Sequence, residues 1–354
     1  MINKKDSIIG CLIGTAVGDA LGLTFEGLSK KRQQKFCKEI KGHHFLFNKG
    51  MVSDDTEHTR MTAQALIVSN GDVDAFLKSF AWKLRFWLLG LPAGIGLATL
   101  KSIIKLWFGF SGRNSGIFSA GNGPAMRSAI IGACYGEDEK KLKQLIKACT
   151  RITHTDPKAE IGALAVAVAA NMASLKNYIS GQEYYEKMEK FLEGENAKEF
   201  LELLKKIVES LNLQKSTEMF AKELGLEKGI TGYIYHTVPV ALYCWLKNQQ
   251  DYKSAIQEII RCGGDTDTTA AITGGIAGAG AGINGIPQEW IKNLWEFPAD
   301  IGWMEKLGTR LAEVCHTGVT QKSLYLPFYA IFFRNVFFMI IVLLHGFRRL
   351  LPPY

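Results

Sequence analysis

Two short clusters of carboxylate and hydroxyl side chains are the strongest chemical signal in this 354-residue chain. One cluster occupies residues 53–57 (SDDTE), and the other occupies residues 263–269 (GGDTDTT). Each comes just before a helical pattern, so helix capping is the simplest interpretation of either one alone. Together they hold more carboxylates than capping requires, and these would repel one another if buried. Oxygen ligands without nearby His or Cys suit Mg²⁺ or Mn²⁺. If the two turns meet, they predict a carboxylate-bridged site for two divalent cations.

Other polar residues stand in glycine-rich segments at 18–26, 121–127, 153–157 and 232–233. The first contains Asp19 and Glu26. The second precedes a helix, where backbone N–H groups could bind a phosphate, although a plain connecting turn is the alternative. His154, in the third, fits either a core histidine or a ring stacked on a nucleotide. Residues 280–285 match GxGxxG but follow a helix instead of a strand, which argues against a dinucleotide site.

The elements that would position these residues are helices. Glycines at 10, 14, 18 and 22 form one stripe on a buried helix, where another backbone can approach closely. Alternating strand patterns bounded by hairpin turns are absent, so the sequence predicts an all-α protein. Residues 175–228, rich in Lys and Glu, are expected to form a pair of amphipathic outer helices. Helical periodicity extends over 59–69, 73–88, 94–108, 124–135, 139–150, 157–174, 183–211, 236–247, 252–262 and 268–282.

Composition narrows the class of protein. The formal charge of +8 favours an anionic partner or surface, but no aromatic-interleaved basic stripe is present, so nucleic acid is not expected as a partner. The seven cysteines are scattered and never spaced as CxxC, which favours a cytoplasmic location. We interpret the apolar N-terminal stretch as part of the fold and not as a signal peptide, since Asp19 and Glu26 follow it.

The C-terminal segment differs in composition from the rest. We expect a domain over 1–320 and an apolar helical extension with a basic end over 321–354. A spanning helix would need Arg334 and Asn335 near its middle, at a cost of about 2.5 to 3.5 kcal/mol for the arginine. Two alternatives remain open: a helix docked on the core, or a peripheral membrane contact in which Arg348 and Arg349 meet anionic headgroups.

Taken in order along the chain, these motifs resemble the ADP-ribosylglycohydrolase family, which includes the dinitrogenase reductase-activating glycohydrolases and the ADP-ribosylarginine and ADP-ribosylserine hydrolases. The resemblance spans residue 10 to about residue 290. The segments that carry it are GCLIGTAVGDALGLTFEG, VSDDTEHT, AGNGPAMRSA, THTDPKAEIGALAVA, GITGYIYHTVPVALYCWL and GGDTDTTAAITGGIAGAGAGINGIP.

The resemblance implies a compact orthogonal helical bundle with a dinuclear Mg²⁺ or Mn²⁺ centre at one end. Glu26, Asp55 and Asp265 would be the catalytic residues, with Glu26 at the entrance of the metal site in a proton-handling or metal-linked role. The implied metal ligands are Ser53, Asp54, Asp55, Asp265, Asp267 and Thr268. The implied substrate-binding residues are Gly121, Asn122, Gly123, Met126, His154 and Tyr233.

The implied activity is hydrolysis of the glycosidic bond between ADP-ribose and an acceptor. The acceptor would be a modified protein side chain, with arginine weakly preferred, or a small molecule. Arginine-directed members are expected to carry an acidic residue before an Ile-Gly pair, and residues 91–96 (LPAGIG) have none. The alternative is a module that binds ADP-ribose without turning it over, tethered to a membrane by the C-terminal helix.

Overall fold

The computed structural model describes residues 2–37 and 39–350, so the last four residues of the expected extension, 351–354, lie outside the described residues. Within these ranges the chain is helical, without a strand, and the predicted all-α fold is confirmed. The helices are α1 (Lys4–Gly22), α2 (Lys30–Phe36), α3 (Asp54–Ser69), α4 (Val73–Leu89), α5 (Leu97–Trp107), α6 (Ala129–Tyr135), α7 (Glu139–Arg151), α8 (Pro157–Leu175), α9 (Gly181–Phe191), α10 (Lys198–Asn212), α11 (Thr217–Glu223), α12 (Ile234–Lys247), α13 (Tyr252–Arg261), α14 (Thr266–Ala281), α15 (Gln288–Lys292), α16 (Ile301–Thr317) and α17 (Phe328–Leu350).

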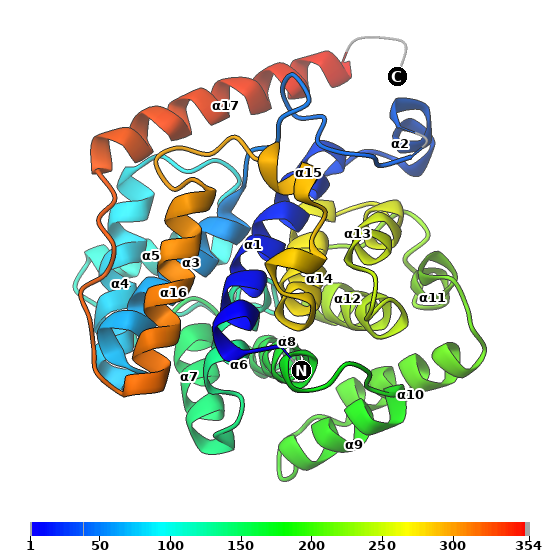
Figure 1. Cartoon of the computed structure of the whole chain (residues 1–354), viewed down its shortest axis with the longest axis horizontal. Coiled ribbons are helices and arrows are strands. Elements are labelled where there is room, and N and C mark those ends of the chain that lie inside the picture. Colours follow the sequence, from blue (N-terminus) through cyan, green and yellow to red (C-terminus); the bar gives the residue numbers. More distant parts are fainter. Residues whose placement is uncertain (1, 38, 351–354) are drawn as a thin grey trace.

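Helices α1 and α14 run side by side through the centre of the molecule (Figure 1). The glycine stripe of α1 makes this possible. A Cβ atom on Gly14 would lie 2.3 Å from the carbonyl oxygen of Gly274, and one on Gly18 would lie 2.1 Å from that of Ala270. The predicted close approach of another backbone is therefore confirmed. Because the helices are antiparallel, the end of α1 at Gly22 packs against Thr266, where α14 begins.

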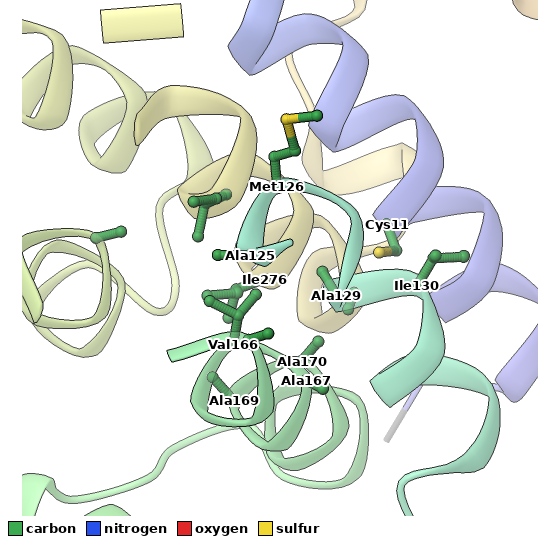
Figure 2. Packing of buried hydrophobic residues seen from close by; sticks show 14 of the residues in the cluster. Cys11, Ala125, Met126, Ala129, Ile130, Val166, Ala167, Ala169, Ala170 and Ile276 are labelled. Carbon is green, nitrogen blue, oxygen red and sulfur yellow. The ribbon is translucent and has the colours of Figure 1, made fainter. Parts of the chain in front are cut away.

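Where α6 and α8 pack together beside this pair, many of the core side chains are small. Figure 2 shows Val166, Ala167 and Ala170 of α8 facing Ala129 and Ile130 of α6. Small side chains let helix axes approach closely, and the buried core fixes their relative positions. The helices that carry the two acidic clusters are thus set by tight packing.

Three periodic segments differ in detail from the expected helices. The run at 183–211 is interrupted between Phe191 and Lys198, and residues 175–228 form three helices, α9, α10 and α11, where a pair was predicted. Each has an exposed face and a face that packs on the core, through residues such as Met188, Phe200 and Phe220. The segment at 124–135 begins with a short 3₁₀ turn, Ala125–Arg127, before α6. Helix α5 begins at Leu97, three residues later than expected, after glycine-containing loop residues.

The C-terminal helix α17 lies across one end of the bundle, joined to α16 by an extended connection along the edge of the molecule (Figure 1). Its inner face packs on the domain through Ala330, Phe338 and Ile341, and through the buried polar residues Arg334 and Asn335. Its outer face is exposed. The segment Phe328–Arg348 is long and apolar enough to cross a membrane, as are Lys4–Phe25 and Pro157–Leu175, which are mostly packed inside the molecule.

Candidate metal-binding active site

The two acidic clusters meet at the ends of three helices. Ser53 caps α3, and its side-chain oxygen accepts a hydrogen bond from the backbone N–H of Asp55. The turn before α14 contains Gly263 and Gly264, both with positive φ, and a Cβ on Gly264 would lie 2.0 Å from the carbonyl oxygen of Ile230. Glycine is the residue that tolerates this conformation and this approach. The turn therefore delivers Asp265 and Asp267 to the start of α14, beside α1.

Asp55 joins the two clusters directly. Its Oδ2 accepts a hydrogen bond from the hydroxyl of Ser53 at 3.0 Å and another from the hydroxyl of Thr268 at 3.2 Å. The other oxygen of this carboxylate, Oδ1, is buried and has no hydrogen-bond partner among the described residues. Segments separated by 213 positions in the sequence thus share one carboxylate, and this carboxylate retains an unused oxygen.

The carboxylates of this site repel one another. Burial raises the pKa of Asp55 well above its usual value, and the charges of Asp19, Asp54 and Asp265 raise it further. Burial and neighbouring carboxylates act in the same direction on the pKa of Asp54 and of Asp267. Buried like charges need a compensating cation or a proton. Oxygen-only donors fit a hard divalent cation, so Ser53, Asp54, Asp55, Asp265, Asp267 and Thr268 have the chemistry to hold one or more.

The six proposed metal ligands do not form a compact coordination group in this conformation. Among the described residues, no group of three or more acidic, histidine or cysteine side chains is arranged to hold a metal ion. Hydroxyl oxygens would therefore have to complete the ligand set, or the carboxylates would have to move closer as a cation enters. Asp54 and Asp265 are only partly buried, which leaves them room to do so.

Asp19 is a further residue of this site that the sequence analysis quoted without assigning a role. It is buried in α1 and accepts hydrogen bonds from the backbone N–H of Ser53, at 2.9 and 3.0 Å, and from the hydroxyl of Thr56 at 2.5 Å. Burial raises its pKa to about 6, against the lowering effect of these hydrogen bonds. Asp19 therefore fixes the turn that carries Ser53. A carboxylate inside a buried, glycine-rich helix was the available signal.

Glu26 lies at the rim of the site. It is exposed, just after the 3₁₀ turn that follows α1. Its charge is one of the causes that raise the pKa of Asp267, which places it near the second cluster. The backbone N–H of its neighbour Gly27 donates to the carbonyl oxygen of Gly264 at 3.0 Å. Glu26 thus stands between solvent and the buried carboxylates.

The predicted substrate-binding segments converge beside the carboxylates. The side-chain amide of Asn122 donates to Asp265 Oδ2 at 2.7 Å, and Gly121 pairs with Tyr233 through an isolated backbone bridge. Met126 is buried in the same turn, and its carbonyl oxygen accepts a hydrogen bond from Thr59 of α3. Loop 121–126 is therefore bound to the second acidic cluster and to α3, the helix that begins in the first cluster.

His154 lies directly beneath the glycine loop. A Cβ on Gly121 would lie 3.1 Å from His154 Nε2, and one on Gly123 would lie 3.2 Å from Cε1. Burial lowers the pKa of His154 to about 3, so the ring is neutral at physiological pH. Its Nδ1 lies 2.9 Å from the Thr153 hydroxyl, which also accepts a hydrogen bond from buried Arg127. The ring is thus held as a flat, uncharged surface, and glycine is the residue that fits above it.

Loop 91–96 closes another side of the site. A Cβ on Gly94 would lie 3.6 Å from Asp54 Oδ1, so this loop borders the first cluster. The loop follows Gly90, whose carbonyl oxygen accepts a hydrogen bond from the side-chain amide of Asn335 in α17 at 2.9 Å. The C-terminal helix therefore contacts a wall of the site.

A buried ion network also connects α17 to the site. Arg334 donates to Glu57 Oε1 at 3.1 Å, to Glu296 Oε1 at 2.5 Å, and to the carbonyl oxygen of Val52 at 2.6 Å. Glu296 in turn accepts a hydrogen bond from the Val52 N–H at 2.9 Å. The backbone N–H and C=O groups of Val52, the residue before Ser53, are thus both hydrogen-bonded to this network. The sequence analysis treated Arg334 as an obstacle to membrane insertion and did not find this network, because its partners are far away in the sequence.

Comparisons with known proteins identify the family of the chain. The sequence profile described as ADP-ribosylglycohydrolase matches residues 1–320. The chain belongs to the ADP-ribosylglycohydrolase family. Enzymes of this family hydrolyse glycosidic bonds of ADP-ribose, and the chain is accordingly a hydrolase, as predicted.

Several members of the ADP-ribosylglycohydrolase family are moderately similar to this chain in sequence. The ADP-ribosyl-(dinitrogen reductase) glycohydrolase of Rhodospirillum rubrum is 27% identical, over 82% of this chain and 90% of its own. The ADP-ribosylhydrolase ARH3 of Gallus gallus is 30% identical, over 81% of this chain and 89% of its own. A solved structure, an ADP-ribosylglycohydrolase-related protein complex, superposes with a TM-score of 0.66 at 25% identity, covering 88% of this chain and 99% of that one.

Proposed function

We propose that the chain releases ADP-ribose from an ADP-ribosylated protein, or from a small-molecule ADP-ribose conjugate, at the site where the two acidic clusters meet. The observation that carries this proposal is the Asp55 carboxylate, which binds hydroxyls from both clusters and keeps a buried oxygen that has no hydrogen-bond partner in the described part of the chain. Such an oxygen is costly unless something binds it.

Two divalent cations, Mg²⁺ or Mn²⁺, are proposed to bind the oxygen ligands named above. When bound, they would act as Lewis acids that orient the distal ribose hydroxyls and lower the pKa of a water molecule. The raised pKa values of Asp54, Asp55 and Asp267 support this, since a cation would relieve the repulsion that raises them.

The other residues would bind and orient the substrate. Loop 121–123 is proposed to lie beside the diphosphate, and the Asn122 side chain connects this loop to Asp265. The backbone N–H of Gly121 donates to the Ser119 hydroxyl at 3.3 Å and that of Asn122 donates to the carbonyl oxygen of Gly232 at 2.9 Å, so a phosphate would have to compete with these hydrogen bonds. His154 offers a neutral ring beneath the ligand. Tyr233, held by a 2.9 Å hydrogen bond from Lys158 Nζ, would contact the ribose or adenine. Glu26, exposed at the rim, would move a proton between solvent and the reacting atoms.

The loop that borders Asp54 bears on the type of bond that joins ADP-ribose to its acceptor. Arginine remains the first candidate acceptor, but residues 91–96 supply no carboxylate to pair with a guanidinium. Release from arginine-linked and serine-linked substrates should be compared side by side. Dominant release from the serine-linked substrate would overturn the arginine preference.

The decisive experiment removes both acidic residues of the second cluster. Asp265→Ala combined with Asp267→Ala should abolish cation-stimulated release of ADP-ribose from ADP-ribosylated protein. Asp74→Ala, which removes an exposed carboxylate of α4, is the matched control and should retain the parental rate. Parental activity in the double variant would refute the site. Binding of ADP-ribose by the wild-type chain without cation-stimulated release would favour the non-catalytic alternative.

We also propose a cytoplasmic location with peripheral membrane contact through α17. Apolar residues spaced three or four positions apart form one exposed face of this helix: Tyr329, Phe333, Phe337, Ile340, Leu344 and Phe347. Large exposed apolar patches mark interaction surfaces, and the basic end of α17 suits anionic headgroups. The buried ion network of Arg334 favours a helix lying on the membrane over one crossing it.

Liposome flotation tests this contact. The full chain should float with vesicles that contain phosphatidylglycerol, and Phe333→Ser with Leu344→Ser should reduce the floating fraction strongly. Met219→Ser, which removes an exposed apolar side chain of α11, is the matched control. Equal flotation of the wild type and the double variant would refute the contact.

A further inference from the structure

A cavity lies between α3, α4 and the C-terminal segment, and Glu57 is the one residue of the two acidic clusters among its lining residues. Its volume is about 820 Å³, within the range of about 300–1,000 Å³ typical of small-molecule sites. None of the residues proposed above to bind cations or substrate lines it. Part of its wall is formed by residues that follow the region matched by the family profile: Ser323, Leu324, Tyr325, Leu326 and Phe328. The C-terminal extension thus helps to enclose a pocket of its own.

The cavity walls are mainly apolar and aromatic. Helix α4 contributes one face, in which lining residues recur three and four positions apart. Opposite it stand Phe297 and the side chains of the extension. The principal apolar lining residues are Met61, Trp82, Phe86, Phe297, Leu324 and Phe328. An aliphatic chain bound here would bury part of its surface against these half-exposed side chains.

The charges that line the cavity are unbalanced. Its two carboxylates, Glu57 and Glu296, already bind Arg334 and lie 3.8 Å from Arg60. Lys78 and Lys83 are the remaining charged lining residues, and neither forms an ion pair with a carboxylate in the part of the chain that the structure describes. Lys83 is half-buried, and its Nζ donates to the amide oxygen of Gln64 at 2.7 Å. The α4 wall therefore presents two positive charges without negative partners.

We propose that this cavity binds a single-chain aliphatic carboxylate, with the chain against the aromatic walls and the carboxylate at Lys83 and Lys78. A half-buried ammonium group bound by one neutral amide gains a charge-assisted hydrogen bond when a carboxylate arrives. Burial lowers the pKa of Lys83 to about 8, and at neutral pH most of the population still carries the charge. A neutral ligand would leave this charge uncompensated, and a cationic ligand would repel it.

Titration calorimetry of the full chain with laurate, below its micelle concentration, tests the proposal. One laurate should bind per chain. Lys83→Met keeps the length of the side chain and removes its charge, and should weaken binding about tenfold or more. Lys101→Met, an exposed lysine of α5, is the matched control and should bind laurate like the wild type. Unchanged affinity in Lys83→Met would overturn the proposed role of the charge.

Two further arms test the cavity and the head group. Ser79→Trp places a bulky ring in the cavity without changing its charge and should abolish binding. Its helical circular dichroism should match that of the wild type, which separates blocking from misfolding. Dodecanol and dodecyltrimethylammonium should bind at least tenfold more weakly than laurate. Equal binding of dodecanol, undiminished binding in Ser79→Trp, or absence of one-to-one laurate binding would overturn the proposal, and none of these results depends on hydrolase activity.

Discussion

The first turn of α3 carries carboxylates into two regions with opposite electrostatics. Asp55 lies among other carboxylates, and the pKa of its side chain is raised by burial and by its neighbours. Glu57, two residues later, binds the guanidinium of Arg334 and the indole N–H of Trp87. One region is buried negative charge without cations among the described residues, whereas the other is a nearly neutral ion network. Acidic residues at one helix N-terminus can therefore form a ligand site or a structural joint, depending on what packs against them.

The largest expected effect is on the rate of ADP-ribose release, after substitution of Asp55 in the carboxylate region. Asp55→Asn keeps the shape of the side chain but removes a charged ligand shared by the two clusters. The rate of ADP-ribose release should fall about a thousandfold or more, or roughly 4 kcal/mol in activation free energy. Without cations, the free energy of unfolding should rise, because one source of repulsion is gone. Chemical denaturation with added chelator measures the second effect. A variant that is both inactive and less stable would contradict this view of the site.

In the ion network around Arg334, removing a charge should lower the free energy of unfolding instead of raising it. Arg334→Met leaves Glu57 and Glu296 without their principal cation, and should lower the free energy of unfolding by about 3 kcal/mol. Arg334 also binds the carbonyl oxygen of Val52, next to Ser53, so the Mn²⁺ concentration that gives half-maximal stabilisation should rise.

Two variants separate positioning from general stability in this region. Arg334→Lys restores the charge but not the fork of donors, and should recover stability more than Mn²⁺ affinity. Arg32→Met, at an exposed arginine of α2, should change neither. If Arg334→Met lowers stability without altering Mn²⁺ affinity, the residue is structural only.

The stabilisation of the fold by divalent cations should increase with pH, because of the carboxylates around Asp55. The raised pKa values of Asp54, Asp55 and Asp267, and of Asp19 at about 6, mean that the folded cation-free chain binds more protons than the unfolded chain. Its stability therefore falls as pH rises from about 4 through those values. Divalent cations displace these protons, so the stabilisation by Mg²⁺ should grow with pH, reaching about 2.7 kcal/mol at a hundred times the dissociation constant. Thermal denaturation at pH 5.5 and 7.5 measures it, and equal shifts would contradict it.

The two regions also differ in how far the sequence predicts them. The carboxylate clusters and the α1 glycine stripe are local patterns, and they indicated which segments meet. Asp19 and Arg334 gave no comparable signal, because their partners at Ser53 and Glu57 lie 34 and 277 positions away. The break between α9 and α10 was likewise missed, since periodicity continues across Leu192 to Ala197 while the backbone turns. Patterns within a helix are readable, whereas a pairing between distant helices requires the packed structure.

The smallest expected effect concerns the second polar contact of α17. The side-chain amide of Asn335 donates to the carbonyl oxygen of Gly90, at the start of the loop that borders Asp54. Asn335→Ala removes this hydrogen bond and the one that Asn335 Oδ1 accepts from Arg334 at 3.2 Å, and should lower the free energy of unfolding by about 1 to 2 kcal/mol. Because Gly90 precedes loop 91–96 and is not itself beside the carboxylates, the KM for ADP-ribosylated protein should rise while Mn²⁺ affinity stays unchanged. Steady-state kinetics and Mn²⁺ titration distinguish this from Arg334→Met. Weakened Mn²⁺ binding in Asn335→Ala would show that α17 acts on the metal-binding turn as a whole and not through Arg334 alone.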